Sequence, residues 1–392
     1  MGKGNVHHTE ADVFPGQGMG HGRGNREFLG TAAAGRKSDR ENAGKKQEKK
    51  ELIKNSKISY SHNVTHYVIT IKKITGLVIL TVSFLFPAFA ETVKGNYGFT
   101  LSPNIGILYG HGEEIVYKDP PRQNLYLSEL LWDMKPLLYA GFGADFGPMD
   151  PSGRRGFAAA LSFKAGLPAR TGVIENRDWI SPPNQNYMTH YSRHDAYSGT
   201  AFLLDVSAGY FWRFFDSLAL NVYGEFSFMH FSWSAKDGYS QYASQLLESP
   251  DYYSPWDNSL NKTPYYGEVI RYKQNWFVIS PGVALDWNMN RLFSLETYFN
   301  YSPLIYCADR DDHLRTRATY LDYLYFGHYI KSGGELIFSA SQKTDLSLFF
   351  SYKYITGPRG DIFQGGRLLA SDSAGVAHSS MDLGLAVKFR LK

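Results

Sequence analysis

The C-terminal end of the sequence alternates between apolar side chains and polar or small ones. Because successive side chains of an extended strand point to opposite faces, the apolar set covers one face and the other set covers the second. An apolar outside and a polar inside are what a transmembrane β-barrel requires, since only a closed sheet satisfies every backbone group in lipid. The apolar set is Leu383, Leu385, Val387, Phe389 and Leu391, and the other set is Asp382, Gly384, Ala386, Lys388 and Arg390.

Similar segments recur along the chain from Tyr97, without a long helical pattern or an apolar run that spans a bilayer as a helix. An aromatic content of 16% also suits strands and membrane interfaces. Short turns and long loops alternate between the segments, as in outer-membrane proteins. We therefore predict an all-β fold, a ten-stranded antiparallel transmembrane β-barrel, over a soluble β-sandwich or lipocalin-like barrel. The predicted strands are 97–110, 125–146, 156–166, 200–213, 217–232, 270–286, 291–303, 325–340, 345–354 and 376–391.

A secretory signal peptide is predicted at residues 71–90. Lys72 and Lys73 precede the apolar run 74–86, and Ala88-Phe89-Ala90 then forms a small-x-small cleavage site. Residues 1–70 are polar and precede the signal, so they are either a disordered cytoplasmic extension or the result of a start codon placed too early. Residues 91–392 are predicted to form the barrel, located in the outer membrane.

The basic charge of the chain belongs to this leader. Residues 1–90 carry 14 Lys and Arg against 7 Asp and Glu, and the remainder carries 27 against 30, a net charge of −3. The basic average therefore gives no reason to expect a nucleic-acid partner. The single cysteine, Cys307, excludes an intramolecular disulfide.

The stretch 308–313, Ala-Asp-Arg-Asp-Asp-His, is the first candidate site. In an extended backbone Asp309, Asp311 and His313 share one side. A carboxylate two residues from a histidine can orient the ring, so that the imidazole can take a proton from water. A solvated acidic loop and a metal site formed by the same three side chains are the alternatives.

Two more charged stretches follow odd-numbered predicted strands. They are Glu113-Glu114 and the segment 174–179, and the 308–313 stretch also follows an odd-numbered strand. In an up-and-down barrel the loops after odd-numbered strands all lie at one end, here the extracellular end. The three stretches are therefore expected to converge on a cleft at the mouth of the barrel.

These residues resemble the omptins, a family of outer-membrane endopeptidases with a ten-stranded barrel. The resemblance extends over about residues 98–392. Asn176-Arg-Asp-Trp179 falls where omptins carry Asp-x-Asp-Trp, and Asp309-Arg-Asp-Asp-His313 falls on an Asp-x-Asp-x-His element. The other similar motifs are Gly106–Gly110, Glu114–Tyr117, Ser128–Trp132, Ser192–His194 and Tyr272–Gln274.

The resemblance implies that Asp311 and His313 are the catalytic pair and that His313 draws a proton from a water molecule. Asp178 would be an opposing carboxylate that holds the water. Asn176 occupies the other opposing position, where the family has Asp, and an amide cannot accept the proton. Glu175 lies next to it but alternation points it away. Activity is therefore expected to be reduced or lost relative to the family.

The resemblance also implies the ligands of the site. Glu114 and Asp309 would form an acidic pocket for an Arg or Lys side chain of a peptide or protein substrate. The mechanism would be metal-free and without a cofactor, with lipopolysaccharide, an outer-membrane lipid, as a possible activator near Lys236 and Arg271.

Two alternative functions stay open at this point. A catalytically silent barrel of the same lineage, acting as an adhesin or structural protein, is consistent with Asn176. A pore or transporter is less favoured, because a ten-stranded barrel has little room for a channel. Glu296 and Lys164, expected on inward faces, would pair to fill the lumen.

Overall fold

The structure is a computed structural model that describes residues 97–118, 125–148, 155–180, 187–245 and 252–391. The predicted N-terminal extension and signal peptide lie outside the described residues. Within the described part, no helix has both the length and the apolar character needed to cross a membrane. All regular structure is β, in one antiparallel sheet.

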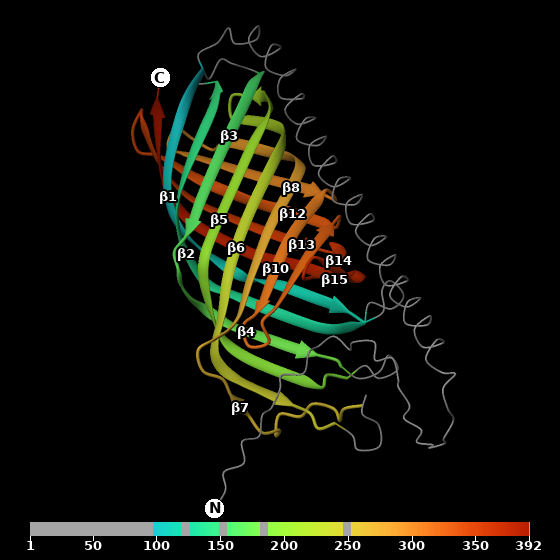
Figure 1. Ribbon diagram of the computed structural model, residues 1–392. Coiled ribbons are helices and arrows are strands. Elements are labelled where there is room, and N and C mark those ends of the chain that lie inside the picture. Colours follow the sequence, from blue (N-terminus) through green and yellow to red (C-terminus); the bar gives the residue numbers. More distant parts are fainter. Residues whose placement is uncertain (1–96, 119–124, 149–154, 181–186, 246–251, 392) are drawn as a thin grey trace, which may run out of the picture. The chain divides into compact units, whose positions relative to one another are not determined.

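Ten strands form a closed ring (Figure 1). Each strand pairs with the next one around the ring, and β1 closes it by pairing with both β2 and β15. The predicted ten-stranded barrel is therefore confirmed. In ring order the strands are β1 (Tyr97–Tyr117), β2 (Tyr126–Pro148), β3 (Arg155–Gly166), β5 (His190–Phe215), β6 (Leu218–Tyr242), β8 (Glu268–Asn288), β9 (Phe293–Ser302), β12 (His328–Ser339), β13 (Thr344–Thr356) and β15 (Arg367–Leu391).

Four of these strands continue beyond a short break, so the ring also has ten strands at its far end. The breaks fall at Leu167-Pro168, Pro303-Leu304, Phe326-Gly327 and Gly357-Pro358. Proline lacks a backbone N–H, and Phe326 and Gly357 have φ values of 56° and 88°, which interrupt a strand. The continuations are β4 (Ala169–Asp178), β10 (Ile305–His313), β11 (Ala318–Tyr325) and β14 (Arg359–Gln364), and a short β7 (Thr263–Pro264) pairs with β6.

The predicted strand ends were wrong at this end of the barrel. The charged stretches 174–178 and 308–313 were expected in loops, yet they lie in β4 and β10. The cause is that extended sheets outside the membrane need no continuous apolar face, so the alternation used to set the ends fades there. At the opposite end the turns are short, as expected, with two residues between β5 and β6 and four between β8 and β9.

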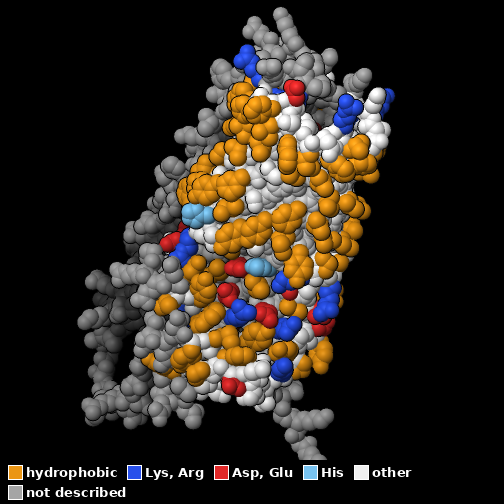
Figure 2. Space-filling model, turned by 180° about the vertical axis from the view of Figure 1, so that it is seen from behind, with side chains coloured by type: hydrophobic (Ala, Val, Ile, Leu, Met, Phe, Trp, Pro, Cys, Tyr) orange, Lys and Arg blue, Asp and Glu red, His pale blue; other side chains and the backbone are white. Residues whose placement is uncertain are grey.

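The outer face carries a broad apolar belt (Figure 2). The belt covers the part of the barrel above the charged end in that view, and Lys, Arg, Asp and Glu gather below it. On β15, Leu383 and Leu385 are 47% and 58% exposed, whereas Asp382 and Ala386 are 4% and 7% exposed. The C-terminal alternation therefore places its apolar set on the lipid face and its polar set in the lumen.

Buried ion pairs line the lumen inside this belt, around a cavity of about 660 Å³. Lys331 lies 2.8 Å from Glu225 and 3.1 Å from Asp205, and Lys353 lies 3.2 Å from Asp205. Lys164 pairs with Asp382, so the expected pairing of Lys164 with Glu296 was wrong. The Lys164 side chain on β3 reaches Asp382 on β15 because the barrel is narrow. Paired charges make each buried cation tolerable, and they leave this half of the barrel polar.

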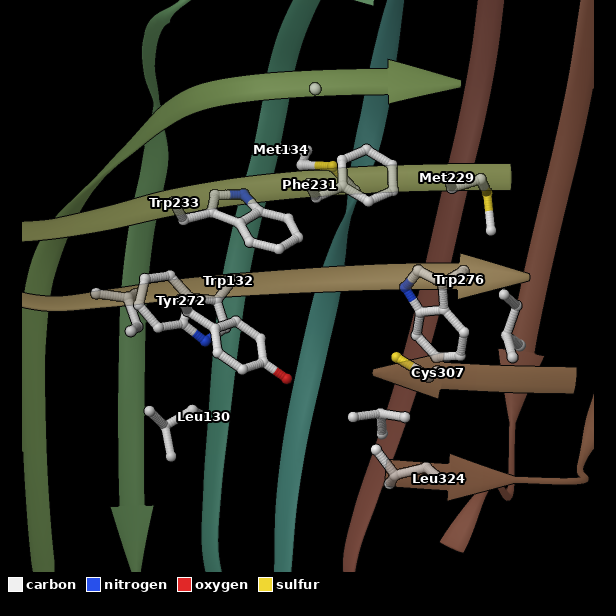
Figure 3. Close-up of a cluster of buried hydrophobic side chains, with 14 of the residues drawn as sticks. Leu130, Trp132, Met134, Met229, Phe231, Trp233, Tyr272, Trp276, Cys307 and Leu324 are labelled. Atoms are coloured by element: carbon white, nitrogen blue, oxygen red, sulfur yellow. The ribbon is translucent and has the colours of Figure 1, made fainter. Parts of the chain in front are cut away.

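A layer of aromatic side chains separates the lumen from the charged end (Figure 3). The Trp132 ring is stacked 5.2 Å from the Tyr272 ring, and the Trp233 ring lies 6.1 Å from Trp132. These rings come from three strands, β2, β6 and β8. All three side chains are at most 1% exposed. The layer is therefore the apolar core of the barrel. A site at the charged end would rest on this layer.

We expect Trp132→Ala to lower the free energy of unfolding by about 3–5 kcal/mol, because it removes a fully buried ring and leaves a cavity. Denaturant titration of the protein in detergent micelles would measure the change. Tyr266→Ala is the control, since Tyr266 is 79% exposed at the same end and its loss should change stability by less than about 0.5 kcal/mol. Equal effects of the two substitutions would contradict the assignment of this layer as the core.

Candidate active site

One wall of the candidate site is β10. His313 Nε2 lies 2.6 Å from Asp311 Oδ2, and the Asp311 side chain is 4% exposed while that of His313 is 28% exposed. Arg310 and Asp312, on the opposite face of the strand, pair with each other at 2.8 Å. Strand alternation therefore brings the carboxylate and imidazole together inside the barrel mouth, as the spacing predicts.

The facing wall is formed by β4 and β2. Ser128 Oγ lies 2.7 Å from Asp178 Oδ1 and 3.1 Å from the amide oxygen of Asn176, and its single proton favours the nearer carboxylate. Asn176 Nδ2 donates to Asp178 Oδ2 at 3.3 Å. Asp178 is therefore held by two donors, one from each neighbouring side chain.

Glu175 does not take the place of the missing Asp. Its carboxylate binds Arg177 at 2.7 Å and accepts from the Tyr191 hydroxyl at 2.9 Å, on the outer side of β4. The alternation that put Glu175 on the opposite face from Asn176 therefore holds. Asn176 is the side chain that faces the cleft at this position.

The two walls border a single cleft. Asn176, Asp178, Asp311 and His313 all line it, together with His190 and His194 on β5 and other side chains. Its cavity volume is about 80 Å³, against the roughly 10–15 Å³ that one water molecule requires. The cleft therefore has room for a few water molecules or a narrow polar group between the imidazole and the Asn176–Asp178 pair.

Burial raises the pKa of Asp178 to about 6, and the Ser128 hydroxyl, His313 and Asn176 each lower it in part. The raised value means that Asp178 is protonated below about pH 6 and charged above it. If the charged form holds the water, kcat/KM falls as the pH drops through about 6.

Ser128→Ala is expected to move this acidic limb to higher pH, because the hydrogen bond that favours the Asp178 carboxylate is lost. The pH profile of kcat/KM between pH 4.5 and 9 would measure the shift. An acidic limb that stays in place, or that moves to lower pH, would show that Asp178 does not control it.

Glu114 and Asp309, the two acids of the predicted substrate pocket, have different surroundings. Glu114 on β1 borders the cleft, but Asp309 is not among the described residues that line it. Asp309 accepts a hydrogen bond from the Tyr272 hydroxyl at 2.9 Å. Burial first, and the charge of Asp311 next, raise the pKa of Asp309 to about 8. The pairing of Glu114 with Asp309 in an acidic substrate pocket therefore stays a prediction.

Asp322 on β11 borders the cleft, although it lies outside the predicted strands and charged stretches. Asp322 pairs in register with Asp309 across the β10–β11 hairpin. Asp322 and Leu324 are two residues apart, so in a strand they share one face, and both are buried. This spacing was the sequence pattern that could have indicated Asp322. It was overlooked because the predicted strand began only at residue 325. Within the described part of the chain, no group of three or more His, Cys, Asp or Glu side chains is placed to hold a metal ion.

A ten-stranded ring with an apolar belt, a charged lumen and short turns at one end defines an outer-membrane β-barrel protein. The chain belongs to the omptin family, whose sequence model matches residues 95–391. This family comprises outer-membrane proteases, and it locates the protein in the bacterial outer membrane. The resemblance noted in the sequence is confirmed.

The structure is similar to that of the outer membrane protease OmpT from Escherichia coli. The TM-score is 0.66 at 17% sequence identity, over 76% of this chain and 100% of that chain. The translocator domain of the autotransporter NalP from Neisseria meningitidis has a TM-score of 0.32 at 10% identity, over 81% and 98% of the two chains. No curated protein sequence matches the chain. At 17% identity the likeness to OmpT shows the fold alone.

Proposed function

We propose that this protein is an endopeptidase that hydrolyses peptide bonds next to basic residues with a water molecule activated by His313. The observation that supports it most directly is the 2.6 Å contact of Asp311 with His313, facing Asp178 across one cleft. An imidazole oriented by a buried carboxylate is a general base, and a polar wall opposite it can hold the water that is to be deprotonated.

The reaction follows from this arrangement. With Nε2–H donated to Asp311, the lone pair of the His313 ring is on Nδ1, which accepts a proton as the water oxygen bonds to the peptide carbonyl carbon. The imidazolium then returns this proton to the amide nitrogen, and the carbon–nitrogen bond breaks. Asp311 stabilises the imidazolium between the two steps.

Asn176 limits this mechanism and gives a second candidate function. The Asn176 amide can hold a water by hydrogen bonds but adds no negative charge opposite the imidazolium. A barrel in which this change has silenced the hydrolysis would act by binding, as an adhesin or structural protein of the outer membrane.

The preference for basic residues rests on the buried carboxylates around the cleft. Burial, and then the charges of Asp311 and Asp309, raise the pKa of Glu114 well above its usual value. A cationic side chain that enters the cleft favours the charged form of such an acid through charge-assisted hydrogen bonds. Substrates with Arg or Lys are therefore part of the proposal.

Activation by lipopolysaccharide is also proposed. Lys236 lies 4.9 Å above the Tyr197 ring, and Arg271 pairs with Glu268 at 2.5 Å. Each of the two cations is next in sequence to a residue that faces inward, so its own side chain faces outward. Outward cations near the membrane boundary favour the phosphate groups of an outer-leaflet lipid.

The experiment is cleavage of a quenched fluorescent Arg-Arg peptide by refolded protein starting at Glu91, with and without lipopolysaccharide. Cleavage next to Arg, stimulated by the lipid, is the expected result. Absence of cleavage by both the natural protein and Asn176→Asp, each refolded with lipopolysaccharide, would contradict the peptidase.

A further inference from the structure

Asp322 brings an additional carboxylate to the candidate site. Its side chain belongs to β11, opposite Asp309 in the register of the hairpin, and the residue is 3% exposed. It lines the same cleft as Glu114, Asp311 and His313. Four acids from four strands therefore line the cleft beside the imidazole, and two of them, Glu114 and Asp322, belong neither to the Asp311–His313 pair nor to the facing Asn176–Asp178 pair.

These acids are incompletely satisfied. Asp322 Oδ1 and Glu114 Oε2 are buried, and neither has a hydrogen-bond partner among the described residues. An unpaired buried carboxylate is costly unless it binds a proton or a cation. Burial, and then the charges of Asp309 and Asp311, raise the pKa of Asp322. A bound cation would stabilise the charged form of this carboxyl group.

We propose that Asp322 is a specificity-determining residue that, with Glu114, binds the cationic side chain of the substrate and selects Arg over Lys. The inference rests on the proposed function. A guanidinium presents five N–H donors in a planar fork, so it can pair with carboxylates on two different strands at once. An ammonium is a compact point charge with three donors. Asp309 accepts a hydrogen bond from the Tyr272 hydroxyl, so it is not needed as a direct partner of the cation.

The test measures binding apart from catalysis. His313→Ala is the inert carrier, and fluorescence anisotropy measures its affinity for three otherwise identical peptides with Arg, Lys or citrulline at one position. Citrulline is the neutral analogue of Arg. The carrier is expected to bind the Arg peptide more tightly than the Lys and citrulline peptides. Asp322→Asn in the same carrier should reduce the Arg to Lys ratio, and it should reduce the Arg to citrulline ratio about tenfold or more, because a charge-assisted pair is lost.

Asp312→Asn is the matched control. This substitution removes the same charge from the neighbouring strand β10. The Asp312 side chain faces outward, where it binds Arg310 and Thr319. Its replacement should leave the Arg to citrulline ratio unchanged. Asp322→Asn should also raise the apparent melting temperature while it weakens Arg binding, because it relieves repulsion among buried carboxylates. A purely structural Asp322 would change stability without changing the ratio.

The outcomes separate this inference from the proposed function. An Arg preference that depends on Asp322, seen in a protein that cleaves nothing when His313 is intact, supports the pocket and contradicts the peptidase. Equal binding of Arg and citrulline peptides by the carrier overturns the inference, whether or not cleavage occurs. An unchanged Arg to citrulline ratio in Asp322→Asn also overturns it.

Discussion

Replacing His313 by alanine is expected to lower kcat for the Arg-Arg peptide by about 10²–10⁴-fold, the usual contribution of a general base. The proton of the attacking water then has no acceptor at the position where Asp311 orients the ring. KM should change much less, because the acids proposed to bind the cationic side chain stay in place. Steady-state kinetics with the quenched peptide would measure both constants.

His328→Ala is the control for this substitution. His328 is an imidazole on the outer side of the barrel, where its ring lies 3.0 Å from the Tyr301 hydroxyl. Its loss should leave the rate within a factor of about two, since surface changes away from a site have small effects. A His313→Ala protein that folds and cleaves at the natural rate would exclude His313 as the base.

Asn176→Asp has the second large expected effect, a gain in kcat of about 10–100-fold at neutral pH. The new carboxylate would face the imidazolium that forms at His313 and stabilise it, where the amide supplies no charge. It would also lie beside Asp178, to which Asn176 Nδ2 now donates at 3.3 Å, so the two acids would share a proton at low pH. The acidic limb of the pH profile should therefore become broader and lie at higher pH.

The matched control is Asn258→Asp, which adds the same charge at an exposed position near the same end of the barrel. It should not change kcat. A natural protein without activity, together with an active Asn176→Asp variant, would identify a silenced omptin whose role is binding. Unchanged or lower activity in Asn176→Asp would show that the amide is not what limits the rate.

The candidate site was predictable only in part. The positions of Asp311 and His313 on one face follow from a period of two, which depends on the backbone being extended and on nothing distant. The same local argument correctly turned Glu175 away from the cleft. Which strand faces which across the barrel is set by closure of the ring, and that depends on residues far apart in the sequence.

The sequence by itself determined the barrel, because lipid leaves no other use for many alternating segments that lack a spanning helix. It also determined the Asp311–His313 pair. Only the tertiary structure decided that Asp322 borders the cleft and that the Tyr272 hydroxyl binds Asp309. Both outcomes depend on the register of the β10–β11 hairpin and on packing of the aromatic layer beneath it. Such contacts join side chains from several strands, and local alternation carries no information about them.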